Sequence, residues 1–301
     1  LGLGAVQAQG AAPEATVALG EVFVSGSRHE QLSDDLPLSI DVISAEALSD
    51  GQASNLRDAL LNLPNVSVKL SPARFSVNGV TASAGRDGNI GLNIRGLGGN
   101  RVLMLSDGIR IPRSYAFRTT TFDREYLSLE LLKRVELVRG PASVLYGSDG
   151  MVGLVNFITH EPADFLTTPA GAAPKTIGGR VSAGWSGDDR GRTLAATVAG
   201  QASDSLQWMV TASGRRAHAL DTMGSNDSAD MNRTTPNPQS DSDNSVMGKI
   251  VLTPGAGQRH VVTLEHIENT SDGQLLSRRT PRTFVGPPAQ IAEAIVNEDS
   301  N

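Results

Sequence analysis

Apolar and polar residues alternate over much of the second half of this chain, and this pattern most limits the folds open to it. Ile177, Val181 and Trp185 fall on one face of an extended segment, whereas Arg180 and Ser182 fall on the other. The alternation recurs in four later segments, which are residues 194–202, 206–215, 246–252 and 260–267. A soluble β-sandwich also alternates. Strands of about 9–11 residues with an apolar outer and a polar inner face are typical of a transmembrane β-barrel.

The connections between these segments alternate in length. Residues 201–205 and 254–258 are short turns, and a long polar loop is predicted over residues 217–245. Short turns on one side of a membrane and long loops on the other are expected of such a barrel. The long loop carries five aspartates, namely Asp221, Asp227, Asp230, Asp241 and Asp243. Their spacing matches no EF-hand, so a solvated loop is favoured over a calcium site and no metal ligands are assigned.

Composition narrows the classes of partner. The chain has 301 residues and a net charge of −6, which does not favour a nucleic-acid partner. It has no cysteine, so disulfides, thiolate metal sites and cysteine nucleophiles are excluded. No apolar stretch approaches the ~18 residues of a spanning helix. A membrane role would therefore depend on strands or on a surface contact.

The amino-terminal residues carry an export pattern. Val6-Gln7-Ala8 fits the small-x-small cleavage pattern that follows the apolar core of a secretory signal peptide. Residues 1–8 are therefore predicted to be the remnant of such a peptide. A disordered tail rich in Ala and Gly is the alternative.

Residues 21–159 show a mixed α/β pattern. Strands are predicted at 21–27, 38–45 and 66–70, a helix at 55–63 and a long loop at 71–90. Ser128 is predicted to cap a short helix that runs through Leu132. Residues 133–159 then give a strand, a turn, a short helix, a glycine turn and a strand.

A glycine-rich turn lies in GLNIRGLGGNRVLMLSDGIRI, residues 91–111. The third glycine of a dinucleotide fingerprint is missing after Gly96 and Gly98, and no Gly-Lys-Ser/Thr follows. A strand-like run follows the turn in place of a helix, so we expect a β-hairpin and no phosphate loop. No nucleophile–base–acid constellation is evident either, and the chain is not predicted to be an enzyme.

Four stretches carry a resemblance to a known family. They are GEVFVSGSR, LRDALLNLPNVSV, LNIRGLGGNRVLMLSDGIRI and LLKRVELVRGPASVLYGSDGMVGLVNFIT, and they run through residues 20–159 in order. The chain resembles a TonB-dependent outer-membrane receptor of a Gram-negative bacterium. The resemblance implies an α+β plug domain followed by the amino-terminal part of an antiparallel transmembrane β-barrel.

The expected organisation follows from this resemblance. Residues 1–8 are the signal remnant, 9–30 a periplasmic segment with the TonB box, 31–160 the plug, 161–175 a linker and 176–301 a partial barrel. Plugged transporters of the outer membrane have ~22 strands, and five are counted here, so the chain is expected to be a fragment. About a dozen residues separate Ala8 from Glu21, too few for the extra domain of signalling receptors. An exported soluble binding protein remains the other alternative.

The resemblance also implies a mechanism and a partner. The TonB complex of the inner membrane pulls on the TonB box, a segment that pairs by strand addition. The candidate box is Glu21, Val22, Phe23, Val24 and Ser25; the alternative is an ordinary first strand of the plug. Family members latch the plug to barrel glutamates through arginines, and the matching residues here are Arg95, Glu136, Arg139 and Glu265. Solvated turn charges are the alternative.

The transported ligand is expected to contain iron. The closer likeness is to receptors for heme, hemoglobin, transferrin and lactoferrin, so heme or heme from a host protein is expected. A ferric siderophore is the alternative, and no resident cofactor is implied. Tyr115 is the axial candidate in the expected apex loops. Four arginines could meet heme propionates or an anionic siderophore, or could be solvated: Arg74, Arg86, Arg113 and Arg118.

Overall fold

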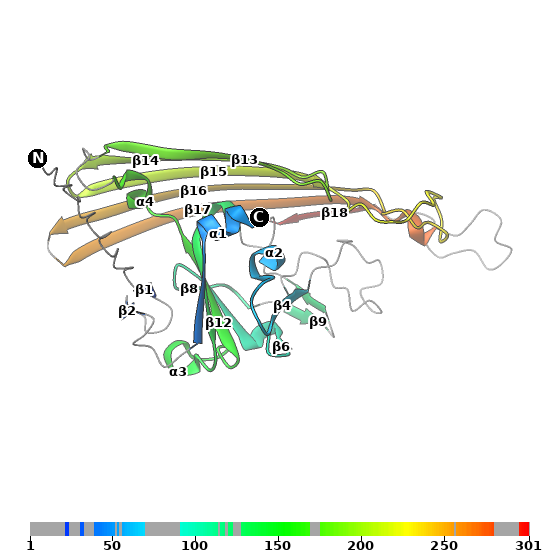
Figure 1. Ribbon diagram of the computed structural model, residues 1–301, viewed down its shortest axis with the longest axis horizontal. Coiled ribbons are helices and arrows are strands. Elements are labelled where there is room, and N and C mark those ends of the chain that lie inside the picture. Colours follow the sequence, from blue (N-terminus) through cyan, green and yellow to red (C-terminus); the bar gives the residue numbers. More distant parts are fainter. Residues whose placement is uncertain are drawn as a thin grey trace, which may run out of the picture.

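A computed structural model describes most of the chain. The described residues are 22–23, 31–32, 39–51, 53, 56–69, 91–113, 115–117, 120–122, 128–168, 175–255, 257–279 and 295–300. A mixed α+β part (39–168) lies below a broad antiparallel sheet, as Figure 1 shows. Within the described residues, no helix is long and apolar enough to span a bilayer.

The mixed part is built on a five-stranded sheet in the order β3-β11-β12-β7-β8. Its strands are β3 (Ser39–Ser44), β7 (Val102–Ser106), β8 (Ile109–Arg110), β11 (Leu132–Arg139) and β12 (Gly153–Thr159). The β12–β7 pair is parallel and the other pairs are antiparallel. The strand β12 is almost wholly buried, which agrees with its largely apolar sequence. The strand β11 carries Lys133, Arg134 and Arg139, which are half-buried, while its other residues are buried.

Smaller elements surround this sheet. A three-stranded sheet holds β4 (Val66–Lys69), β5 (Gly91–Ile94) and β6 (Leu97–Gly98). Two-stranded pairs join β1 (Val22–Phe23) to β2 (Gln31–Leu32) and β9 (Tyr115–Phe117) to β10 (Thr120–Phe122). The helices are α1 (Ala45–Asp50), α2 (Leu56–Leu60), α3 (Ser143–Tyr146) and α4 (Pro162–Leu166), with 3₁₀ turns η2 (Gly99–Arg101), η3 (Leu129–Leu131) and η4 (Leu276–Arg278).

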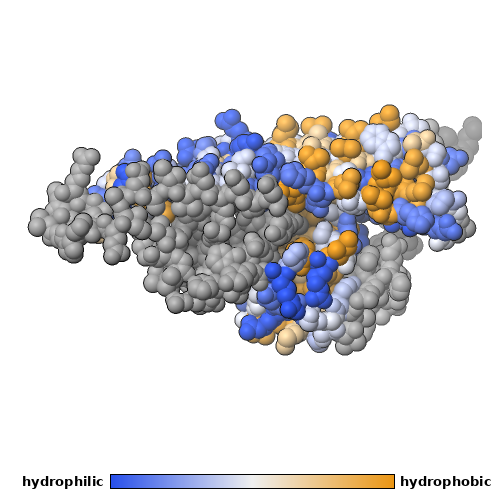
Figure 2. Space-filling view, turned by 180° about the vertical axis from the view of Figure 1, so that it is seen from behind, coloured by the Kyte–Doolittle hydropathy of each residue, from blue (hydrophilic) through white to orange (hydrophobic). Residues whose placement is uncertain are grey.

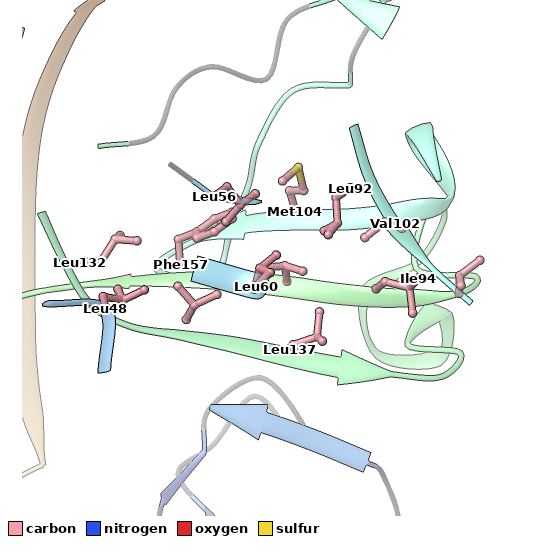
Figure 3. Close-up of a cluster of buried hydrophobic side chains, with 13 residues drawn as sticks. Leu48, Leu56, Leu60, Leu92, Ile94, Val102, Met104, Leu132, Leu137 and Phe157 are labelled. Carbon is pink, nitrogen blue, oxygen red and sulfur yellow. The ribbon is translucent and has the colours of Figure 1, made fainter. Parts of the chain in front are cut away.

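The main core of the mixed part, which contains the predicted plug, lies between the five-stranded sheet, α1, α2 and the β4–β5 pair. Phe157 and Leu137 point from the sheet toward Leu60 of α2, and Ile94 closes one end (Figure 3). The predicted α/β pattern is confirmed here, although α2 (Leu56–Leu60) is shorter than the predicted 55–63. The helix ends early because residues 61–65 form turns, in which Asn65 has a φ of 61°.

The second half forms one antiparallel sheet in chain order. Its strands are β13 (Ile177–Trp185), β14 (Arg192–Ser203), β15 (Leu206–His218), β16 (Gln239–Gly255), β17 (Gln258–Gln274) and β18 (Ile295–Ser300). The five predicted strands are confirmed, but β16 and β17 each have 17 residues and β18 adds a sixth strand. The long loop is consequently shorter than predicted, at residues 219–238, and Asp241 and Asp243 lie on β16.

The glycine-rich turn differs from the prediction in its second strand. Arg95 and Gly96, with φ values of 53° and 85°, make a two-residue turn between β5 and β6. The apolar run that follows, β7, leaves this hairpin and pairs with β12 and β8 in the central sheet. Predicting that run as the partner of residues 91–94 was therefore wrong, because η2 turns the chain into another sheet.

Candidate functional site: the plug against the inner face of the sheet

The broad sheet has one face toward the plug and one away from it. Large apolar side chains on the far face are exposed, and Figure 2 shows apolar residues gathered over the sheet. They include Val181, Leu194, Val210, Ile250 and Leu264. The near face is largely covered: Thr197, Thr211, Met247 and Lys249 on it are buried. The predicted division into an apolar outer and a more polar inner face is confirmed.

An apolar contact joins the plug to the near face. Leu131 of the plug and Leu166 of α4 pack on Ala199, Met209 and Met247 of the sheet. The helix α4 falls within residues 161–175, which were predicted to be a linker, and it packs on the sheet. The end of the plug is therefore attached to the sheet by packing as well as by the chain.

Hydroxyl groups extend this contact. The Ser128 Oγ lies 3.3 Å from the Ser213 Oγ and 3.1 Å from the Ser245 Oγ. Ser182 donates to the Glu130 carboxylate at 3.3 Å. The predicted cap by Ser128 is wrong: η3 is a single 3₁₀ turn without a side-chain cap, and the hydroxyl of Ser128 contacts the sheet.

The most buried charge on the near face is Lys249, on β16. Its ammonium lies 3.1 Å from the Asp107 Oδ2 and donates to the Thr159 hydroxyl, and only 2% of its side chain is exposed. Asp107 reaches it from the Asp-Gly turn between β7 and β8, where φ is 47° at Asp107 and 80° at Gly108. Asp107 also accepts from the Thr159 N–H at 2.8 Å. We call Lys249, Asp107 and Thr159 the Lys249 cluster.

Sequence reasoning missed this cluster. The available signal was a lysine on the inward face of a strand, between Met247 and Val251. Such a charge needs a partner, because burying an unpaired charge is costly. The partner could not be found from the sequence, since 142 positions separate Lys249 from Asp107.

A second polar group lies where the plug joins the sheet. Asp164 of α4 pairs with Lys133 and accepts from the Glu161 N–H at 2.8 Å. The His160 Nδ1 lies 3.5 Å from the Asp164 carboxylate, and its buried ring nitrogens have no hydrogen-bond partner in the described part of the chain. Burial raises the pKa of Asp164, but the opposite effect of His160, the Glu161 N–H and Lys133 is larger. The pKa is therefore lowered from 3.8 to about 2.

The predicted latch residues are placed differently. Arg139 pairs with Asp41 and Glu136 with Arg134, both within the plug, and Arg95 is exposed in the β5–β6 turn. Glu265 lies on the near face of β17. The structure therefore does not bring these four residues together, and their latch role stays a prediction.

The predicted TonB box and ligand residues are only partly described. Val22 and Phe23 form β1, whereas Glu21, Val24 and Ser25 lie outside the described residues, as do Arg74, Arg86 and Arg118. Tyr115 begins β9. Arg113 bonds to the Asp149 carboxylate at 2.7 Å and to the Ser148 hydroxyl at 3.0 Å. Their ligand roles stay predictions.

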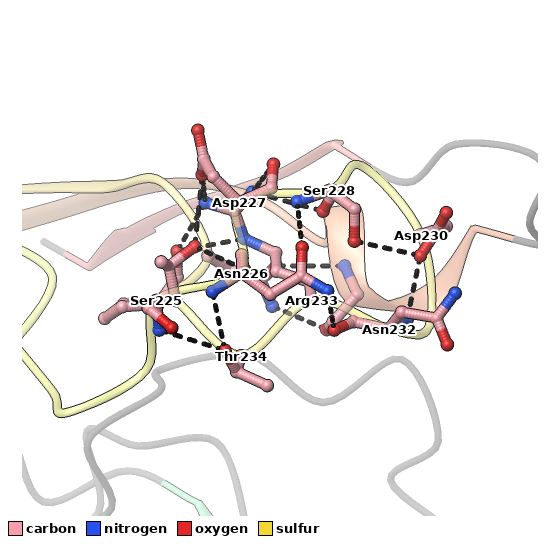
Figure 4. Close-up of polar contacts among 12 residues, drawn as sticks. Ser225, Asn226, Asp227, Ser228, Asp230, Asn232, Arg233 and Thr234 are labelled. Carbon is pink, nitrogen blue, oxygen red and sulfur yellow. Dashed lines mark hydrogen bonds and ion pairs between the residues drawn. The ribbon is translucent and has the colours of Figure 1, made fainter.

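The loop between β15 and β16 holds its own charges. The Arg233 guanidinium donates to the carbonyls of Asp227 and Pro236 and pairs with the Asp227 carboxylate at 2.8 Å. Asp230 accepts from the Ser228 hydroxyl and the Asn232 N–H (Figure 4). These aspartates thus order the loop, and no group of three or more His, Cys, Asp or Glu among the described residues could hold a metal.

A cavity of about 120 Å³ lies at the base of this loop. Its lining is mainly apolar and includes Leu220, Pro236, Pro238 and Leu275. The cavity is large enough for a single ring or side chain.

Known proteins resemble both halves of this arrangement. Residues 33–154 match the TonB-dependent receptor plug domain. A vitamin B12 transporter of Vibrio vulnificus is 33% identical over 138 residues, which is 46% of this chain and 20% of that protein. A hemin receptor of Yersinia enterocolitica is 31% identical over 145 residues, 48% of this chain and 19% of that protein. The chain thus spans about a fifth of the length of these relatives.

Solved structures extend the likeness to the sheet. The pyoverdine outer-membrane receptor of Pseudomonas aeruginosa PAO1 matches 84% of this chain and 30% of its own, with 17% identity and a TM-score of 0.58. A siderophore receptor of Acinetobacter baumannii matches 78% of this chain and 31% of its own, with 20% identity and a TM-score of 0.53. At this identity the likeness concerns the fold. Residues 33–154 therefore match the TonB-dependent receptor plug domain, and the antiparallel sheet after them has the fold of part of the barrel in such receptors.

Proposed function

We propose that this chain belongs to an outer-membrane receptor that takes up an iron-containing ligand with energy from TonB. The observation that supports this most is the plug domain seated on the near face of a sheet whose far face is apolar. A far face of this kind suits contact with lipid, and a plug on the near face suits a gated path. The receptor is not an enzyme and acts in the outer membrane.

Heme, or heme from a host protein such as hemoglobin, is the proposed ligand. The 31% identity to a hemin receptor over 145 residues supports this choice. A ferric siderophore is the second candidate, because two siderophore receptors share the fold. Tyr115, Arg113 and the arginines at 74, 86 and 118 are proposed as ligand contacts.

The energising contact is proposed at residues 21–25. The β1 backbone already pairs as a strand with β2, in the register Val22 to Leu32 and Phe23 to Gln31. A short segment that pairs in this way suits strand addition to a partner protein. TonB is the proposed partner.

Growth under iron starvation tests both function and ligand. A deletion strain would be compared with the same strain carrying the intact gene, with hemin, hemoglobin or a ferric siderophore as the sole iron source. We expect loss of growth on hemin and hemoglobin only. Loss on the siderophore alone would overturn the heme assignment. The deletion strain would also be grown in a separate culture that depends on cobalamin. Loss of growth there, with unchanged growth on every iron source, would overturn the proposal that the ligand contains iron.

A further inference from the structure

Lys249 depends on the plug for its partners. Asp107 and Thr159, which bond to its ammonium, both belong to the plug, whereas Lys249 belongs to the sheet. Its side chain is buried. If the plug moved away without a replacement, the ammonium would lose both contacts at once. Removing one partner of a buried ion pair is strongly unfavourable.

A second carboxylate is available on the sheet itself. In the β16–β17 pair, Met247 lies opposite Glu265 and Lys249 lies opposite Thr263. Glu265 and Lys249 therefore share the near face as diagonal neighbours, a separation that long side chains can bridge. Glu265 is exposed and makes no hydrogen bond or ion pair within the described part of the chain.

The charges around Glu265 act in opposite directions. Lys249 attracts its carboxylate, and Asp107 repels it. With the plug seated, Asp107 holds the ammonium and Glu265 lies beside a like charge. With the plug displaced, the repulsion would disappear and the attraction would remain. Glu265 therefore disfavours the seated state and favours the displaced one.

We propose that Glu265 is the second partner of Lys249, which passes from Asp107 of the plug to Glu265 of the sheet when the plug moves. This inference rests on the proposed function, because it requires the plug to move during uptake. Glu265 is then a positioning residue that acts through Lys249. It lowers the cost of opening by giving the ammonium a carboxylate partner after Asp107 has moved away.

A different role for Glu265 would predict the opposite effect of its loss on the seated state of the plug. If Glu265 instead helped to hold Lys249 in place for the seated plug, its loss would weaken the seated state. If Glu265 exchanges partners with Asp107, its loss would strengthen the seated state. The sign of one substitution therefore decides between the two.

Plug displacement can be followed by a single label. The chain has no cysteine, and Met151 is an exposed plug residue, so a nitroxide on Met151→Cys reports the plug alone. The protein would be reconstituted in vesicles and titrated with urea. We expect Glu265→Gln to raise the midpoint of plug release by roughly 0.5 M and Asp107→Asn to lower it by a similar amount.

Two further variants test the mechanism. In the Asp107→Asn background, Glu265 is the carboxylate nearest to Lys249 in both states and no longer faces a like charge on Asp107, so adding Glu265→Gln should leave the midpoint unchanged. Glu161→Gln is the matched control, because it removes the exposed plug–sheet ion pair between Glu161 and Arg259. It should shift the midpoint little. A lower or unchanged midpoint in Glu265→Gln alone would overturn the proposal.

A carbodiimide, which joins a lysine to a carboxylate in contact with it, identifies the partner directly. Peptide mass spectrometry should find Lys249 linked to Asp107 without urea, and to Glu265 at a urea concentration that displaces the label. A link to Glu265 with the plug seated, or no such link after displacement, would overturn the exchange. If either of these results were found and cells with the intact gene still grew on hemin, the proposed uptake would stand and only the exchange of partners would be wrong.

Discussion

At the scale of single residues, Asp164 makes the stability of the plug depend on pH. Its pKa of about 2 lies below the ordinary value of 3.8, so the folded state favours the ionised form. The stabilisation is present above about pH 4 and is lost as the pH falls toward 2.

We therefore expect Asp164→Asn to lower the free energy of unfolding at neutral pH by on the order of 1 kcal/mol, after allowance for solvent screening. The same variant should show a weaker dependence of stability on pH between 4 and 2. Urea unfolding of the plug across this pH range measures both effects. Asp50→Asn, at an exposed site at the end of α1, is the control. An equal loss in both variants would contradict the role of Asp164.

Gly153 shows how closely the plug sheet is packed. A Cβ at this position would lie 2.5 Å from the Val138 carbonyl oxygen and 2.9 Å from the Ile94 Cδ1. Gly153→Ala should therefore destabilise the plug by about 1–3 kcal/mol. Gly248→Ala is the matched control, since its added Cβ has no atom within 4 Å. The urea midpoint of plug unfolding should fall in the first variant only.

At the scale of elements, the strands of the sheet are defined by what each face contacts. Leu264 lies on the outer face of β17 and is 74% exposed, whereas Val261 lies on the near face of the same strand. An arginine on the lipid side of a strand costs about 2–4 kcal/mol near the bilayer midplane, and one on the inner side is tolerated.

Leu264→Arg should consequently reduce the folded protein recovered in outer membranes far more than Val261→Arg does. Heat-modifiable mobility in gels, which distinguishes folded barrels from unfolded chains, measures the folded fraction. Equal recovery of the two variants would contradict the assignment of the faces.

The sequence predicted the strands that have one face toward lipid and the other toward the plug. Alternation located β13–β15 and the middle of β16 and β17, because lipid and plug select opposite side chains there. It failed at residues 239–245, which are polar on both faces and were predicted as loop, yet they pair with β15 and β17. Backbone hydrogen bonds extend the strand there without any demand for an apolar face. The Lys249 cluster depends on contacts between distant segments, which local patterns do not encode.

At the scale of the whole molecule, the proposed uptake requires residues 21–25 to engage the proposed partner, TonB. Val22→Pro removes a backbone N–H and opposes the pairing that strand addition needs. We expect this variant to bind hemin at the cell surface like the parent but to lose growth on hemin. Val22→Thr keeps the N–H and should retain growth. Normal growth of Val22→Pro would contradict residues 21–25 as the contact.

The strand order of the plug has a mechanical consequence. Along the chain, β3 is the first strand of the central sheet, and it lies at the edge, paired with β11 alone over six residues. The far end of the plug is held by α4, which packs on the sheet through Leu166. Tension applied at the amino terminus is therefore carried first by the β3–β11 pairing. We expect β3 to peel away under load before β11 and β12 are strained, so that a path opens by partial unravelling while the rest of the plug stays anchored.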